Sequence, residues 1–250
     1  MLRNYLPQAV VRELFGDRRR YGTRVQPDDP DWQRWLELFP EIYQATQRPG
    51  SLEARLNATG YRVLKGLDTT GLKLCELGPG GGYHLRALEG APASYTALDV
   101  TDTFFPRLEQ AMTARGTAFQ GLRLDRPDLP LETHSQDLCL SFYSLEHVDP
   151  LESWIDELMR VLRPGGRLVG AIPAEGGLAW GLGRWLTSRR TFQKKYGLDL
   201  LKIICWSHPN LCDTITASLR RRGAYQERRW PLPFLGYDFN LVIRFTLVKP

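Results

Sequence analysis

The sequence lacks the features that mark membrane-spanning, secreted and disulfide-rich proteins. No apolar run in its 250 residues approaches the roughly 20 that a transmembrane helix needs. Residues 1–20 hold no continuous apolar core of signal-peptide length, so we expect a cytoplasmic protein. No CxxC pair is present, so the cysteines are expected to be small buried side chains rather than disulfide partners or zinc ligands. They are Cys75, Cys139, Cys205 and Cys212.

A strong excess of one charge is also missing. The 33 Lys and Arg against 28 Asp and Glu give a formal net charge of +5. The basic residues nevertheless occur in short clusters, at 18–20, 189–190, 194–195, 220–222 and 228–229. Solvated helix ends are one explanation, because cations favour helix C-termini. Attraction to an anionic substrate, a lipid surface or nucleic acid is the other.

Residues 1–70 are polar and dotted with proline, and we expect them to form an N-terminal helical arm or cap. Large apolar side chains recur at helical spacing within 31–39 and within 52–67. The length of the whole chain fits one α/β domain that carries such an arm or insertions.

From residue 71 onward, short apolar runs alternate with helical patterns. Strands are expected at 72–77, 94–98, 118–124, 137–142, 167–172, 226–230 and 241–248. Helices are expected near 83–88, 102–114, 150–162 and 210–222, and a turn at Arg163 to Gly166 ends the third of these. Such alternation predicts an α/β fold with a Rossmann-like, doubly wound, mostly parallel sheet of seven strands. Residues 174–207 interrupt the rhythm as an insertion after the fifth strand.

Glycines at every second position follow the first expected strand. The pattern is acid-x-Gly-x-Gly-x-Gly, made of Glu76, Gly78, Gly80 and Gly82. A tight turn without side chains lets the backbone approach a nucleotide-like ligand. The dinucleotide fingerprint needs a glycine at its sixth position, where this chain has Tyr83 or Leu85. The spacing therefore disfavours a nicotinamide cofactor.

Other strand ends also carry polar residues. Asp99 closes the second strand 17 positions after Gly82, near the separation of about 20 at which an acid meets a ribose. Asp125 follows the third strand, and the segment 141–148 follows the fourth. Because ligands of open α/β sheets bind at the carboxyl ends of the strands, these residues are expected to share a site.

Five separated segments now match one family in order. They are Glu76-x-Gly-x-Gly-x-Gly, Leu98-Asp99, Asp125-x-x-x-Leu129-Pro130, Asp137 through Ser141 to Val148, and Arg160 to Gly166. Together they resemble the class I S-adenosylmethionine (SAM) dependent methyltransferases of the branch that acts mostly on small molecules. The resemblance covers about residues 71–173. It implies that 71–250 is a SAM-binding methyltransferase domain and that the last two strands form an antiparallel edge hairpin.

The resemblance implies a role for each matching residue. Glu76 and the backbone of Gly78, Gly80 and Gly82 would hold the methionine end of SAM. Asp99 would accept hydrogen bonds from the ribose hydroxyls, and Val100 would pack against the adenine. Asp125 would accept from the adenine amino group beside the backbone of Arg126. Ser141 and Phe142, with Tyr143, would line the side where the methyl group leaves and S-adenosylhomocysteine (SAH) forms.

A hydroxyl acceptor also needs a general base, and histidine suits neutral pH. His147 is the best candidate by location, although Leu145 to Val148 is a common structural turn in this family. Tyr143 is a second catalytic candidate, and His84 and His208 are weaker ones.

The insertion 174–207 interleaves aromatic and basic side chains. Arg184, Trp185 and Lys194 are the residues predicted to bind substrate, and nearby glycines would allow a mobile lid. Two other interpretations stay open, namely an interfacial helix on a membrane and an ordinary packing helix. The segment after the fourth strand lacks the prolines and cysteine of base-modifying DNA methyltransferases, so a nucleic-acid substrate is not expected.

The sequence therefore predicts a SAM-dependent methyltransferase acting on a small molecule or a glycan- or lipid-linked intermediate, with no metal. The acceptor and the oligomeric state are left open. The alternative is a non-catalytic SAM-binding or interaction protein. An RNA methyltransferase or a nicotinamide-dependent oxidoreductase is less favoured.

Overall fold

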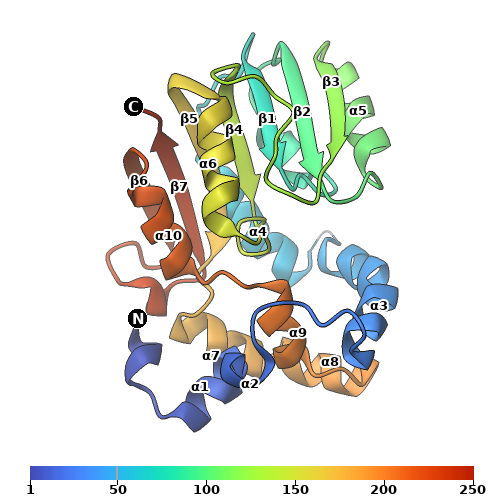
Figure 1. Ribbon diagram of the computed structural model, residues 1–250, viewed down its shortest axis with the longest axis vertical. Coiled ribbons are helices and arrows are strands. Elements are labelled where there is room, and N and C mark those ends of the chain that lie inside the picture. Colours follow the sequence, from blue (N-terminus) through green and yellow to red (C-terminus); the bar gives the residue numbers. More distant parts are fainter. Residues whose placement is uncertain (49) are drawn as a thin grey trace.

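A seven-stranded sheet forms the centre of the computed structural model, which describes residues 1–48 and 50–250. The strands are β1 (Lys73–Leu77), β2 (Ser94–Asp99), β3 (Ala118–Arg123), β4 (Gln136–Phe142), β5 (Leu162–Pro173), β6 (Ala224–Trp230) and β7 (Val242–Val248). Their order across the sheet is β3-β2-β1-β4-β5-β7-β6 (Figure 1).

Strand directions follow the predicted α/β topology. β3, β2, β1, β4 and β5 are parallel, and β7 runs antiparallel to both β5 and β6. The predicted Rossmann-like sheet and its antiparallel edge are confirmed. Chain order reverses between β1 and β4, so a ligand crevice is expected beyond the carboxyl ends of these two strands.

Helices cover both faces of the sheet and one of its ends. They are α1 (Gln8–Phe15), α2 (Arg18–Tyr21), α3 (Pro30–Thr46), α4 (Leu52–Tyr61), α5 (Phe105–Thr113), α6 (Leu151–Val161), α7 (Leu178–Leu186), α8 (Ser188–Tyr196), α9 (Leu200–Ser207) and α10 (Cys212–Arg220). Short 3₁₀ turns are η1 (Leu2–Tyr5), η2 (Arg62–Leu64), η3 (Tyr83–Ala87) and η4 (Tyr237–Phe239).

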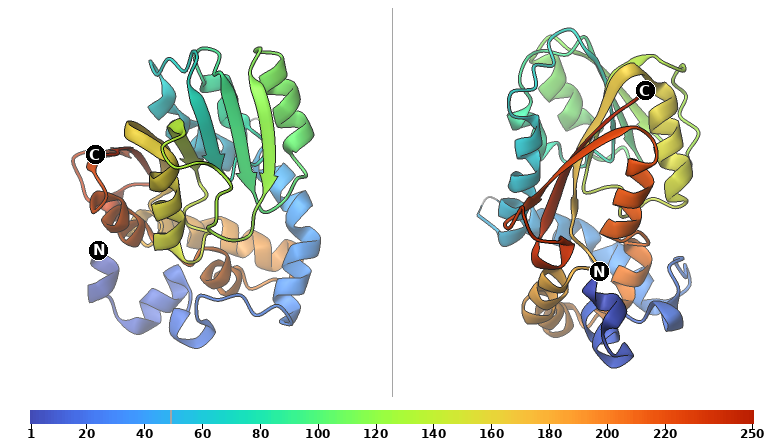
Figure 2. Two further views of the ribbon diagram at one scale, coloured as in Figure 1. Left: turned by 45° about the horizontal axis from the view of Figure 1, so that its top comes forward. Right: turned by 90° about the vertical axis from the view of Figure 1, so that its left-hand side faces the viewer.

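Two apolar cores lie on opposite faces of the sheet, because side chains alternate along each strand. α6 and α10 bury Ile155, Leu158 and Leu219 against one face. α5 buries Leu108 and Met112 against the other, where η2 and η3 also pack (Figure 2). All four cysteines are buried and free.

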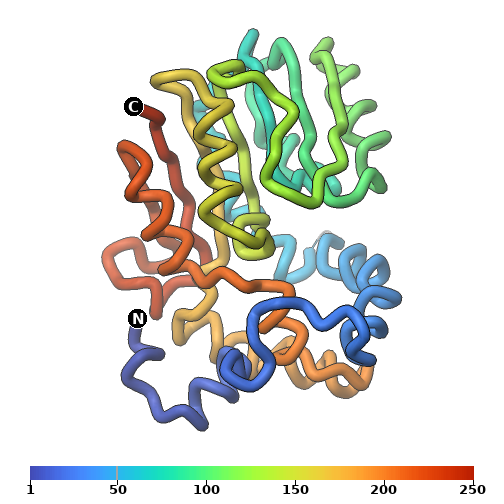
Figure 3. Tube along the Cα trace, viewed as in Figure 1, coloured from blue at the N-terminus to red at the C-terminus, as the bar shows by residue number. Residues whose placement is uncertain are grey.

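The N-terminal helices and the insertion after β5 pack together beyond the carboxyl ends of the parallel strands (Figures 1 and 3). α1 contacts α7 and α9, and α2 and α3 contact α9. Trp206 Nε1 donates a hydrogen bond to the Tyr21 carbonyl at 2.9 Å, and Lys202 Nζ lies 2.7 Å from Asp29. The two segments that the sequence separates by more than a hundred residues therefore form one helical layer.

Two expected elements differ from the sequence prediction. The helix expected near 83–88 is only the 3₁₀ turn η3, because Gly90 and Pro92 leave too little chain for another helical turn. The turn expected at Arg163 to Gly166 belongs to β5, which begins at Leu162 with a register shift against β4. None of the helices within the described residues is long and apolar enough to cross a bilayer.

The centre of the sheet predicts a strong substitution effect. Gly170 pairs with Ser141 across β4 and β5, and a Cβ at Gly170 would collide with the Ser141 carbonyl oxygen. We expect Gly170→Ala to destabilise the fold by about 1–3 kcal/mol in urea unfolding, as overpacking does. Gly183→Ala is the control, because a Cβ there meets open space on α7 and should stabilise slightly. Equal stabilities of the two variants would contradict this packing.

Candidate cofactor site and acceptor side

The glycine-rich loop leaves β1 in a conformation that favours glycine. Gly78, Gly80 and Gly82 have φ angles of +65°, +48° and +66°, where other residues are strained. The Gly78 amide donates to the Leu98 carbonyl at 2.8 Å, which ties the loop to the end of β2. Ser144 Oγ donates to the Gly78 carbonyl at 3.1 Å from the segment after β4. The loop is therefore held by the two strands that flank β1.

Tyr43 of α3 lies on this loop, and the sequence analysis missed it. Its hydroxyl accepts a hydrogen bond from the Gly81 amide at 3.0 Å, and a Cβ at Gly80 would collide with it. Its ring lies 5.3 Å from the ring of Phe104, centroid to centroid. Burial raises the pKa of Tyr43, so the hydroxyl stays protonated. No local pattern could have shown this contact, because it joins the N-terminal arm to the loop.

Glu76 is fully buried beneath the loop. The Tyr95 hydroxyl donates to its Oε2, and His84 Nε2 lies 2.8 Å from the same oxygen. Glu76 Oε1 and Ser141 Oγ are buried without a hydrogen-bond partner among the described residues. A buried polar atom without a partner is costly, so these two atoms mark where a polar group of a ligand would fit.

The end of β2 places Asp99 and Val100 beside the loop. Asp99 is partly buried, and its Oδ1 accepts from the Thr101 amide at 3.1 Å. Burial raises the pKa of Asp99 above its usual value. Val100 is 65% exposed, which is unusual for a valine and leaves an apolar surface for a planar ring. Asp125 and Arg126 are exposed just beyond β3, the neighbouring strand.

These residues fit the nucleoside and amino acid parts of SAM. The loop offers a bare backbone, Asp99 offers a carboxylate and Val100 an apolar face. Glu76 Oε1 and Ser141 Oγ, two of the buried oxygens that lack partners in the described part of the chain, lie near the ends of β1 and β4, on either side of the switch point. The predicted cofactor residues thus come from adjacent strand ends, and their individual roles stay predictions.

Tyr143 is held by structure rather than presented to a ligand. It has a positive φ of 56°, and its hydroxyl donates to the carbonyl groups of Leu56 and Asn57 on α4. Burial raises its pKa well above its ordinary value. The geometry does not favour its predicted role as a base. Phe142 is buried, and its ring stacks on His84 at 5.1 Å.

His147 lies beyond the carboxyl end of β4 and is exposed. Its Nδ1 is 2.6 Å from the Ser207 carbonyl, so this nitrogen is the donor and Nε2 carries the lone pair. The ring of His208 meets it edge to face, 4.5 Å between centroids. His147 therefore keeps the position that a base would need.

Arg184 differs from its expected role as a free cation for substrate. It is 9% exposed, and its Nη2 donates to Glu175 Oε1 at 2.6 Å. The α7 helix faces inward at this position, so the guanidinium is already paired. The predicted direct contact between Arg184 and an anionic substrate is not supported by this geometry.

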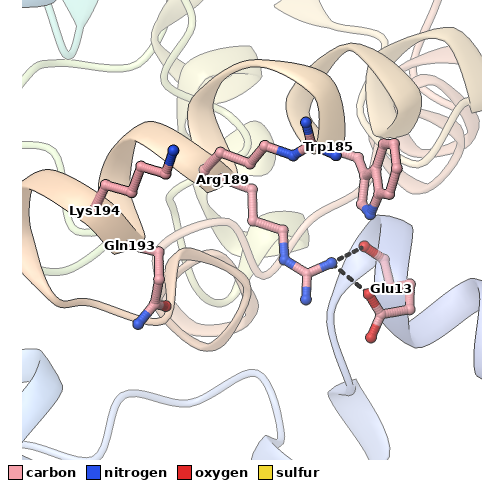
Figure 4. Close-up of a pocket in the computed structure, with 6 residues that line it drawn as sticks. Glu13, Trp185, Arg189, Gln193 and Lys194 are labelled. Carbon is pink, nitrogen blue, oxygen red and sulfur yellow. Dashed lines mark hydrogen bonds and ion pairs between the residues drawn. The ribbon is translucent and has the colours of Figure 1, made fainter.

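Trp185 and Lys194 line a cavity of about 410 Å³ between α7, α8 and α1 (Figure 4). Arg189 points at Glu13 across it, with Nη1 and Oε2 2.5 Å apart, while Arg190 lies over the Trp185 ring at 5.0 Å. The side chains that line it come from the helical layer and not from the strand ends. Binding of an anionic acceptor group here stays a prediction.

The described residues contain no group of three or more His, Cys, Asp or Glu side chains suited to a metal ion.

Comparison with known proteins identifies the same part of the chain. Residues 75–170 match the family model described as a methyltransferase domain. A demethylmenaquinone methyltransferase of Tropheryma whipplei is 33% identical over 138 residues, which cover 53% of this chain and 56% of that protein. A probable phthiotriol/phenolphthiotriol dimycocerosates methyltransferase 2 of Mycobacterium ulcerans is 32% identical over 165 residues, which cover 65% and 59%. The chain thus spans between half and two thirds of the length of these relatives.

A solved structure shows the same fold over nearly the whole chain. The N-methyltransferase NodS from Bradyrhizobium japonicum, in complex with SAH, has a TM-score of 0.56 at 15% identity. The match covers 89% of this chain and all of that one. The strand order, the glycine loop and the acid after β2 agree with the methyltransferase domain that the family model matches at residues 75–170, and the chain has the fold of this solved methyltransferase.

Proposed function

We propose that this chain transfers the methyl group of SAM to a small-molecule or lipid-linked acceptor. The observation that carries the proposal is the joint position of the glycine loop and Asp99 at the switch point of the sheet. The family model that matches residues 75–170 describes a methyltransferase domain, which supports SAM as the cofactor.

The chain's contribution to such a reaction is mainly positioning. SAM supplies an activated methyl group, and an in-line displacement needs the acceptor atom held close to it. The loop backbone would hold the methionine end, Asp99 the ribose, and Val100 and Asp125 the adenine. The Tyr43 hydroxyl accepts a hydrogen bond from the Gly81 amide, so α3 would order the glycine-rich loop before SAM binds.

The names of the relatives support a lipid-linked or other small acceptor over nucleic acid. They are named for demethylmenaquinone and for phthiotriol dimycocerosates, and another is named a malonyl-[acyl-carrier protein] O-methyltransferase. On this chain Leu182 and Leu186 of α7 are exposed beside the basic residues of α8. Such a surface suits contact with an anionic lipid layer from which a lipid-linked acceptor would enter.

The test is transfer of labelled methyl from SAM to a panel of acceptors: demethylmenaquinone, a phthiotriol lipid and malonyl-acyl carrier protein. We expect one acceptor to gain label and SAH to accumulate in proportion. SAM binding without transfer to any acceptor would favour the non-catalytic alternative. Absence of SAM binding would exclude both.

A further inference from the structure

A carboxylate and a histidine form a pair that the cofactor residues do not use. Glu175 lies two positions after β5 and is 2% exposed. Its Oε2 is 2.5 Å from Nδ1 of His208, which directly follows α9. Its other oxygen accepts from Arg184, so both carboxylate oxygens have partners. The sequence rule that found Asp99, an acid at a strand's carboxyl end, also applies to Glu175.

The pairing fixes the chemistry of the His208 ring. With the Nδ1 proton directed at a carboxylate, Nε2 keeps the lone pair and can accept a proton. The side chain of His208 is 18% exposed, so its ring reaches solvent, whereas the side chain of Glu175 is only 2% exposed. A carboxylate behind an imidazole orients the ring and stabilises the imidazolium that forms on proton transfer.

Charged groups of both signs surround the pair. Arg184 sits on the far oxygen of Glu175, and Arg18 Nη2 donates to the His208 carbonyl at 2.8 Å. His147 faces the ring of His208, and the buried Glu146 lies one residue earlier, with its pKa raised by burial to about 8. The two guanidinium groups disfavour an imidazolium on His208, whereas Glu175 favours it.

We propose that His208 is the general base of the acceptor site, with Glu175 as its positioning residue, and that the acceptor reacts at a hydroxyl or an acidic C–H. The proposal rests on the proposed methyl transfer. β4 and β5 are adjacent parallel strands, and their carboxyl ends carry His147 and Glu175 beside the switch point. A substrate reaching the methyl group from this side would meet the His208 ring.

The step is balanced without another reactant. The acceptor O–H or C–H bond breaks, and its proton goes to His208 Nε2. The electron pair left on the acceptor forms the bond to the methyl carbon. The S–CH₃ bond breaks with its pair going to sulfur, which gives neutral SAH. The imidazolium then releases its proton to water. A positively charged SAM and a neutral acceptor thereby become two neutral products and one released proton.

His147 is the competing candidate and differs in its partner. Its Nδ1 meets the Ser207 carbonyl, which is a weaker support for an imidazolium than a carboxylate. The rings of His147 and His208 are in contact, so protonation of one ring would disfavour protonation of the other. The variants must therefore separate the two histidines.

The experiment compares His208→Asn, His147→Asn, Glu175→Gln and Glu175→Asp in the full chain. His134→Asn is the matched control, since this histidine lies in a turn before β4 with a φ of +61° that asparagine tolerates. We expect His208→Asn to lower kcat by about 100-fold or more and to remove the acidic limb of the rate–pH profile. SAM affinity should stay unchanged. Glu175→Gln should shift that limb, and Glu175→Asp should restore part of the rate. Loss of the limb in His147→Asn but not in His208→Asn would overturn the assignment.

A second measurement needs no acceptor. Diethylpyrocarbonate reacts with neutral imidazole, and peptide mass spectrometry locates the product in the SAH-loaded protein. We expect His208 to react at neutral pH in the wild type, and Glu175→Gln to change the rate of that reaction. A His208 that stays protonated or unreactive up to pH 8 would overturn the base role. If no acceptor is methylated, the proposed function fails, while this measurement still decides on His208.

Discussion

Replacing Asp99 with alanine is expected to weaken SAM binding by about 100-fold or more. A carboxylate at the end of β2 can accept a hydrogen bond from each ribose hydroxyl, and hydrogen bonds to charged groups contribute about 1.5–3 kcal/mol each. Two such bonds correspond to a change of 10²-fold or more in the dissociation constant, because about 1.4 kcal/mol is tenfold. Isothermal titration calorimetry with SAM and SAH measures it directly.

Asp102→Ala is the matched control for this prediction. Asp102 is exposed three residues further along the same loop, so its removal changes the local charge equally. Wild-type affinity for SAM in Asp99→Ala would contradict the assignment of Asp99 to the cofactor site.

A pH series gives a second test of Asp99. Burial raises the pKa of Asp99, and binding needs the carboxylate, so affinity should begin to fall at a higher pH than an ordinary aspartate would give.

The sheet could be predicted because its signal is local. Each strand is a short apolar run bounded by turn residues, and the acids at 76, 99 and 125 follow from the position of strand ends. Parallel strands align their carboxyl ends, so residues found separately along the chain could be assigned to one site. The same reasoning predicted Glu76 as a site residue. It did not predict that Glu76 is buried against Tyr95 and His84.

The rest depends on contacts between distant segments. Tyr43 meets Gly81 across 38 positions, and His208 meets Glu175 across 33. Nothing in the local pattern of α3 or α9 specifies such a partner. Arg184 shows the same limit of sequence-based prediction, because here a role was expected that the fold does not support. Its basic neighbours suggested a free cation, whereas the fold turns it inward onto a buried carboxylate.

Replacing Arg184 with methionine is expected to destabilise the protein by about 3–5 kcal/mol at neutral pH. Methionine keeps most of the volume but leaves the buried Glu175 with His208 alone, and an uncompensated buried charge costs this much. Arg189→Met is the matched control on the neighbouring helix. Its pair with Glu13 has a similar length of 2.5 Å, but the two side chains are 32% and 59% exposed. Exposed pairs contribute about 0–1 kcal/mol.

Urea unfolding of both variants measures the difference, and its pH dependence identifies the cause. Burial alone would raise the pKa of Glu175, but Arg184 and His208 outweigh burial and hold it well below its usual range. In the wild type, the stabilisation by Glu175 is therefore present above its unfolded pKa of about 4.3 and is lost only as pH falls through the depressed folded pKa. Without Arg184, burial dominates and Glu175 takes up a proton more readily. The deficit of Arg184→Met should then be largest near pH 7 and shrink toward pH 4. A deficit that stays constant with pH would mean that lost packing, and not the buried carboxylate, is responsible.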